Sequence, residues 1–171
     1  MSHRSGFSLI EVLSVLVLVS LVAVSVTLRW GDMYRDVQHQ AQIEKIIDVD
    51  FKARRHATGR HRICRLIFDL DKQSIRSSRW VDGVEKFVQH HLKGGTRISK
   101  IRSVSRVDSD NQIEITVSDL GATPTYAVQL THDDDFRWIV FAGRTGQSKI
   151  VEDGKEVDEL FASLQSENAI R

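Results

Sequence analysis

A single carboxylate stands directly before a long apolar run that contains no other charge. No residue from Val12 to Leu28 is charged, and Glu11 immediately precedes this run. A helix from Phe7 to Leu28 would be roughly 33 Å long, enough to cross the hydrocarbon core of a bilayer. An unpartnered carboxylate there costs about 2.5–3.5 kcal/mol on insertion scales. Residues 7–28 therefore predict a transmembrane helix in which Glu11 requires a compensating partner.

A signal peptide and a buried core helix both fit this segment less well than a membrane span. A secretory signal peptide has a shorter apolar region that ends in small residues around a cleavage site, and Val24-Ser25-Val26 is a poor match to such a site. A buried core helix rarely lacks charge over so long a stretch. Arg4 and the amino terminus precede the segment, whereas the charges after it balance. The positive-inside rule therefore predicts a cytoplasmic N-terminus, with the rest of the chain across the membrane.

The run Gly6-Phe7-Ser8-Leu9-Ile10-Glu11-Val12 resembles the class III signal of type IV prepilins and type II secretion pseudopilins. The resemblance implies that residues 1–6 are a leader, removed after Gly6 by a membrane peptidase that then methylates the new amino group of Phe7. It also implies that Glu11 pairs with the amino group of Phe7 in a neighbouring filament subunit. Such a pair would offset the desolvation of Glu11 and set the axial register.

Two alternatives for Glu11 do not require a filament. The carboxyl group can remain protonated, because burial raises the pKa of a carboxyl group. It can also interact favourably with the N-terminal end of the helix dipole.

The helix is predicted to continue through residues 29–58 as a periplasmic half, since this stretch has no proline. Thr58-Gly59 supplies the stop signal. The helical period places the apolar residues on two stripes, which suggest one surface for the protein's own sheet and another for neighbouring helices. One stripe contains Met33, Val37, Ile43, Ile47 and Phe51, and the other contains Ile46, Val49, Ala53 and Ala57.

Beyond Gly59 the apolar period changes toward two, which is typical of strands. The order of one long helix and then many strands predicts an α+β fold, with residues 59–171 forming an antiparallel sheet domain packed on the helix. Val84–Leu92 is ambiguous between a strand and a short helix, and Val157–Leu164 is predicted as a terminal helix. The predicted strands are Arg62–Asp71, Gln73–Val81, Thr96–Val107, Ile113–Leu120, Tyr126–Thr131, Phe136–Ala142 and Ser148–Val151.

Short segments of this domain resemble the GspH/FimT group of minor pseudopilins and minor pilins. They include Arg65–Asp69 as an early strand, Leu92–Ile98 as a turn with Gly94-Gly95, and Ile113–Ile115 leading to Tyr126–Val128. The resemblance implies a pilin-like fold and a structural rather than enzymatic role.

The remaining polar residues do not indicate an active site or a cofactor. His56, His61, His90 and His91 have no recognised ligand spacing and are predicted to be solvated. Three consecutive acids at residues 133–135 are better explained as a soluble turn than as a calcium site. Cys64 is the sole cysteine, so no intramolecular disulfide can form, and its apolar strand predicts that it is buried. We therefore expect no metal, no cofactor and no catalytic residues.

A cluster of cations is the one candidate for nucleic-acid contact, because phosphate binding requires grouped positive charge. The cluster at the junction of helix and sheet consists of Arg54, Arg55, His56, Arg60, His61, Arg62 and Arg65. Of these, the candidate contacts are Arg54, Arg55, Arg60 and Arg62, to which the FimT-like resemblance adds Arg144 in a glycine-arginine turn. Without the leader the chain has 23 basic and 23 acidic residues, since Arg4 leaves with it. This balance favours local pairing of the arginines with acids over binding of a polyanion.

The sequence thus predicts a single-pass protein of the bacterial inner membrane with a periplasmic C-terminal domain. Its expected role is that of a minor pseudopilin at the initiation or tip of a type II secretion pseudopilus. Expected partners are the prepilin peptidase, other pseudopilins and the inner-membrane assembly platform. The alternatives are a FimT-like minor type IV pilin that takes part in DNA uptake, and a membrane-anchored binding domain that never polymerises.

Overall fold

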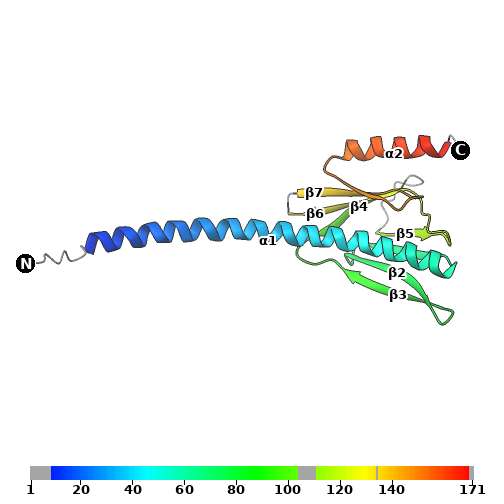
Figure 1. Ribbon diagram of the computed structural model, residues 1–171, viewed down its shortest axis with the longest axis horizontal. Helices are drawn as coiled ribbons and strands as arrows, with labels where there is room; N and C mark the ends of the chain where they lie inside the picture. Colours follow the sequence, from blue (N-terminus) through cyan, green and yellow to red (C-terminus); the bar gives the residue numbers. More distant parts are fainter. Residues whose placement is uncertain (1–8, 104–110, 134, 170–171) are drawn as a thin grey trace, which may run out of the picture. The chain divides into compact units, whose positions relative to one another are not determined.

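The computed structural model describes the backbone of residues 9–103, 111–133 and 135–169, and the side chains of these residues except 26–35 and 165–169. The chain forms two compact units, Met1–Gln38 and His39–Arg171. Helix α1, Leu9–Arg60, contributes residues to both units. The second unit contains every strand of the described residues and the second helix (Figure 1).

Helix α1 ends two residues beyond the predicted Thr58. Its last turn closes when the backbone N–H of Arg62 donates to the carbonyl of Ala57 at 3.1 Å. His61 takes the left-handed conformation there, with φ of 49°. Gly59 was expected to adopt the terminating conformation, but it lies within the helix. The non-glycine residue His61 adopts it instead, as happens at some helix ends.

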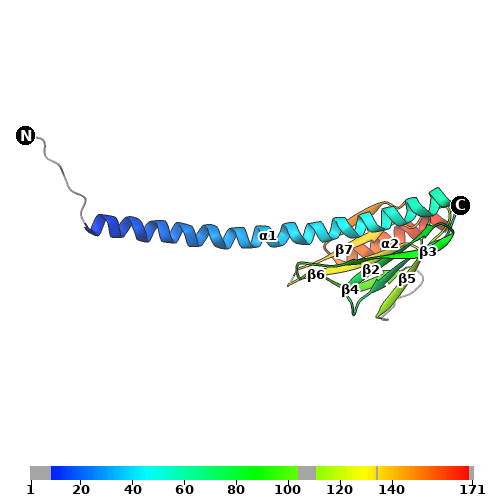
Figure 2. The same ribbon diagram turned by 90° about the horizontal axis from the view of Figure 1, so that it is seen from below.

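The eight strands found among the described residues form two antiparallel sheets rather than the single predicted sheet. The first sheet has the order β3-β2-β1-β5 and the second has the order β4-β6-β7-β8. Figure 2 shows the strands alongside the C-terminal part of α1. Val84–Leu92, whose pattern is ambiguous, forms strand β3 over Val84–His91. The other strands are β1 Cys64–Asp69, β2 Ser74–Val81, β4 Arg97–Ser103, β5 Gln112–Val117, β6 Tyr126–His132, β7 Asp135–Phe141 and β8 Ser148–Val151. Of the predicted Thr96–Val107, residues 104–107 lie outside the described part.

The main core lies between the C-terminal part of α1 and the inner faces of both sheets. The helix contributes five buried residues spaced three or four apart: Ile43, Ile46, Val49, Ala53 and Ala57. The sheets add Leu66, Phe68, Ile115, Tyr126, Val128, Ile139 and Phe141, among others. One predicted stripe is therefore the core face. The other was partly wrong, because Ile43 belongs to the core while Val37 and Phe51 are more than half exposed.

Helix α2, Gly154–Ala169, covers the other face of the second sheet. A second apolar cluster seals this contact, with Val157 and Phe161 from the helix packed near Trp138, Val140 and Val151. The helix starts three residues before the predicted Val157, because Asp153 accepts a hydrogen bond from the backbone N–H of Lys155 at 3.0 Å and caps the first turn. These features together make an α+β, pilin-like fold.

Cys64 is fully buried at the start of β1 and is a free thiol, as its apolar strand predicted. Burial raises the pKa of the thiol, an effect that a hydrogen bond from Ser78 opposes. Since the thiolate is the reactive form, we expect Cys64 to resist alkylation by iodoacetamide in the folded protein. It should become fully labelled in denaturant. Labelling at equal rates in both states would contradict this prediction.

Candidate functional site

The N-terminal segment is the candidate assembly site. Gly6 and Phe7, the predicted cleavage and methylation residues, lie outside the described residues. Glu11 lies in the first turn of α1. Every large apolar side chain from Leu9 to Val24 is between 47% and 85% exposed. So large an apolar surface needs lipid or partner helices to cover it.

Three serines in this segment satisfy their hydroxyl donors within the helix. The hydroxyl of Ser14 donates to the carbonyl of Ile10. Ser20 and Ser25 donate in the same way to Leu16 and Leu21, at 2.8 and 2.9 Å. A hydroxyl bonded to the carbonyl four residues earlier exposes no unsatisfied donor to an apolar environment. The serines are therefore compatible with burial of the whole segment against apolar partners.

Among the residues that the structure describes, no helix is long and apolar enough to cross a membrane. The predicted span of residues 7–28 extends beyond the stretch 9–25, whose side chains are described.

In the second unit, Arg54 is the centre of a buried polar network and not part of a surface. Its side chain is 9% exposed, and its Nε lies 2.7 Å from Oδ2 of Asp50 one turn earlier. Its Nη1 donates to the carbonyls of Gly121 and Gly143, at 3.0 and 2.8 Å, and its Nη2 donates to Oγ1 of Thr123 at 2.7 Å. The guanidinium group therefore joins α1 to the β5–β6 loop and to the β7–β8 turn.

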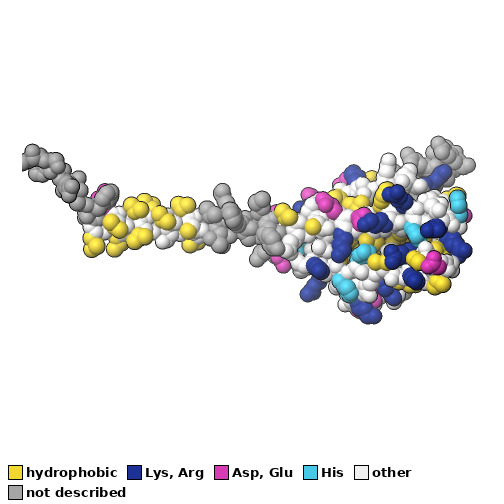
Figure 3. Space-filling model, turned by 60° about the horizontal axis from the view of Figure 1, so that its bottom comes forward, with side chains coloured by type: hydrophobic (Ala, Val, Ile, Leu, Met, Phe, Trp, Pro, Cys, Tyr) yellow, Lys and Arg dark blue, Asp and Glu magenta, His cyan; other side chains and the backbone are white. Residues whose placement is uncertain are grey.

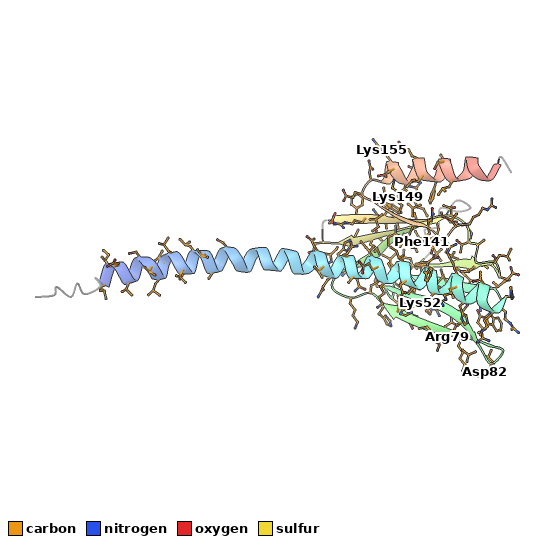
Figure 4. The ribbon with its side chains drawn as sticks, in the orientation of Figure 1. Lys52, Arg79, Asp82, Phe141, Lys149 and Lys155 are labelled. Carbon is orange, nitrogen blue, oxygen red and sulfur yellow. The ribbon has the colours of Figure 1, made fainter. Side chains whose placement is uncertain are left out.

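The second oxygen of Asp50 is also satisfied, because the hydroxyl of Tyr126 donates to Oδ1 at 2.7 Å. The ring of Tyr126 is fully buried and stacks on Phe141, with ring centroids 4.7 Å apart (Figure 4 labels Phe141). Burial, followed by the charge of Asp50, raises the pKa of Tyr126 well above its usual range. The network thus keeps a neutral phenol beside a paired carboxylate in the core.

The predicted phosphate contact was therefore wrong for Arg54, since its donors are directed at carbonyls, Thr123 and Asp50. The expectation of local pairing with an acid holds for this residue. Sequence reasoning missed Asp50 and Tyr126 as its partners. An aspartate one turn before an arginine, both beside the buried stripe of α1, was the available signal.

The β7–β8 turn packs closely on Arg54. Gly146 has φ of +70°, and a Cβ added there would lie 3.0 Å from Cδ of Arg54. A Cβ added at Gly143 would come within 2.1 Å of the carbonyl oxygen of Thr123. Both glycines are thus required for the turn to approach the helix and the neighbouring loop. Arg144 lies between them and is exposed.

Replacing Gly146 with Ala is expected to lower the free energy of unfolding by about 1–2 kcal/mol, because the left-handed conformation is unfavourable for a residue that carries a Cβ. The contact with Arg54 adds to this cost. Gly59→Ala is the matched control: it lies within α1 with no atom within 4 Å of the added Cβ, so we expect a gain of about 0.4–1 kcal/mol. Urea unfolding followed by tryptophan fluorescence measures both. A Gly146→Ala variant as stable as the parent would contradict this account.

Three of the remaining predicted cations, Arg55, Arg60 and Arg62, are exposed around the end of α1. The guanidinium group of Arg62 stacks on the ring of Trp80, with its Cζ 4.5 Å from the ring centroid. Lys and Arg side chains gather on the face of the second unit that Figure 3 shows. These residues form a cationic surface, whereas Arg54 beneath them is structural.

The histidines are not all solvated as predicted. His61 and His91 are exposed. His56 is an exception, because its Nε2 accepts a hydrogen bond from the backbone N–H of Trp80 at 2.9 Å. Burial lowers the pKa of His90, and the nearby Lys45 acts in the same direction. Within the described part of the chain, no three His, Cys, Asp or Glu side chains are grouped to hold a metal ion.

Comparison with known proteins adds two findings. Residues 1–27 match the family model of the prokaryotic N-terminal methylation motif. The fold is similar to the solved structure of the minor pseudopilin EpsH from the type 2 secretion system of Vibrio cholerae, with a TM-score of 0.51 and 11% identity. This likeness covers 68% of the present chain and 98% of EpsH. No protein of curated function matches the sequence. The chain is therefore prepilin-like at its N-terminus and pilin-like in fold.

Proposed function

We propose that this protein is a minor pseudopilin, a structural subunit at the initiation site or tip of a type II secretion pseudopilus. One combination supports the proposal: a methylation motif over residues 1–27 stands on a chain with a pilin-like fold. Neither part alone is sufficient. The motif supports only the processing of the N-terminus. At 11% identity, the similarity to EpsH supports only the fold.

In this proposal the prepilin peptidase cuts after Gly6 and methylates the amino group of Phe7. The mature protein is anchored in the bacterial inner membrane by residues 7–28, and its second unit lies in the periplasm. The apolar side chains from Leu9 to Val24, so widely exposed in a single chain, are first covered by lipid and then by the helices of neighbouring subunits.

Glu11 supplies specificity in this scheme. Its position in the first turn of α1 is close in sequence to the new amino terminus, so an adjacent subunit shifted along the filament axis can present its Phe7 amino group. The exchange of lipid for apolar helices is nearly neutral, because both are equally apolar. A single ion pair in that environment can therefore decide the register.

The proposed partners are other pseudopilins and the inner-membrane assembly platform, and the proposed role is not enzymatic. A minor type IV pilin in DNA uptake is the second candidate, and the exposed Arg55, Arg60, Arg62 and Arg144 favour it. The burial of Arg54 removes one of the five cations on which that candidate relied.

Deletion of the gene in its own bacterium separates the two candidates. We expect export of folded enzymes to stop, and natural transformation to continue at the parental rate. Complementation with a variant that carries Arg55→Glu, Arg60→Glu and Arg62→Glu should restore export. Normal export together with lost transformation would reject the secretion role and support DNA uptake.

A further inference from the structure

Strand β3 is an edge strand of the first sheet. It lies at one end of the order β3-β2-β1-β5, and it pairs with β2 from Ser74↔His91 to Val81↔Val84 without a register shift. Alternate residues of such a strand direct their N–H and C=O groups away from the sheet. At its C-terminal end the Nζ of Lys45 donates to the carbonyl of His91 at 3.2 Å.

The other edges are less suited to pairing with a further strand. Strand β3 has eight residues, whereas β8 has four and leads into α2, and β5 has six. Strand β4 has a register shift between Ile98 and Lys100, and a bulge of this kind disrupts the regular ladder. Strand β3 also exposes apolar side chains: Val84 is 58% exposed and Phe87 is 42% exposed. A long, regular and partly apolar edge is a template for an added strand.

The part of the chain that contains the second half of α1 and strands β1 to β3 is rich in cations. Residues 45–93 include 12 Lys or Arg and 6 Asp or Glu, although the whole chain has a net charge of only +1. Four of these acids are already paired, with Lys52, Arg54, Arg65 and Lys72. Arg79 and Lys86 lie opposite each other in the β2–β3 register, and both are exposed. Figure 4 labels Arg79 and Asp82 in this hairpin, and Figure 3 shows cations gathered on this side of the unit.

We propose that β3 binds an extended acidic segment of a partner protein, which pairs with it as an additional antiparallel or parallel strand of the sheet β3-β2-β1-β5. The main-chain ladder supplies the pairing, and the excess positive charge selects carboxylates on the partner. A second copy of β3 is disfavoured, because it would bring Arg79 and Lys86 against the same cations. This site is separate from the N-terminal assembly segment, and it does not depend on the secretion role.

The test uses the full chain in detergent micelles and a fluorescent peptide that alternates Glu with Val. We expect saturable binding, with amide shifts in a nitrogen-15 spectrum concentrated in Val84–His91. The same peptide with every backbone amide methylated retains its charge but has no N–H donor on either edge, so it cannot form the ladder and should not bind. A peptide with Lys in place of Glu should not bind either.

A matched pair of variants tests the charge requirement. Arg79→Glu with Lys86→Glu should weaken binding roughly tenfold. Arg97→Glu, at an exposed position on the edge strand β4, should leave binding unchanged. Equal binding of the methylated peptide would overturn strand pairing. A single-stranded oligonucleotide that competes fully with the acidic peptide would assign the surface to nucleic acid instead, and self-association through β3 would assign it to a second copy.

Discussion

Replacing Arg54 with Ala is expected to lower the free energy of unfolding by about 3–5 kcal/mol. Most of this loss in stability comes from the buried polar groups that the substitution leaves without their partner. Asp50 is 3% exposed, and without Arg54 its buried carboxylate loses its counter-charge and keeps the hydrogen bond from the hydroxyl of Tyr126. The carbonyls of Gly121 and Gly143 lose a donor at the same time. Urea unfolding of the full chain in micelles, followed by the fluorescence of Trp80 and Trp138, measures the change.

Two further variants show whether the buried charge is the cause. Arg55→Ala removes the neighbouring exposed arginine and should change stability by no more than about 0.5 kcal/mol. Arg54→Met combined with Asp50→Asn leaves no unpaired charge, so it should be more stable than Arg54→Ala alone. If Arg54→Ala were as stable as Arg55→Ala, the network would not be a determinant of the fold.

Replacing Glu11 with Ala is expected to abolish incorporation into filaments without reducing membrane insertion. Removing a carboxylate from an apolar segment favours insertion by roughly 2.5–3.5 kcal/mol on insertion scales. Assembly would lose the proposed ion pair with the amino group of a neighbouring subunit, and each 1.4 kcal/mol so lost lowers incorporation about tenfold. Sheared filaments and washed membranes, each probed with an antibody to the second unit, measure the two quantities.

The controls for Glu11 lie on the same helix. Ser14→Ala removes a hydroxyl that is bonded only to its own helix, so incorporation should be unchanged. Glu11→Gln keeps the size and loses the charge, so it should behave like Glu11→Ala. Full incorporation of Glu11→Gln would mean that Glu11 acts without its charge, as a helix-terminal residue or in protonated form.

The regular strands were predictable because one of their faces is buried. Strand β8 has the predicted bounds, and β6 and β7 are displaced by one residue at most. Strand β3 remained ambiguous because it is an edge with no fully buried residue, so apolar and polar residues do not alternate cleanly. The division into two sheets was missed because it depends on pairing of β1 with the distant β5, which a local period does not encode.

The candidate sites also differ in how far their residues could be predicted from the sequence. The N-terminal motif is contiguous, so its residues were recognisable together. The role of Arg54 depends on contacts 67 and 89 residues away in sequence. The run Arg54-Arg55-His56 therefore looked like one surface cluster. In the folded chain, position 54 points inward while position 55 is exposed, because the two side chains lie on different faces of α1.

The mass of the N-terminal peptide tests the central claim most directly. The protein should be purified from the membranes of its own bacterium, digested, and analysed by tandem mass spectrometry. We expect a first peptide that begins at Phe7 and carries one methyl group on its amino nitrogen. A Gly6→Leu variant should retain residues 1–6. A native protein that begins at Met1 or Ser2 and carries no methyl group would contradict the proposal that it is a processed pseudopilin.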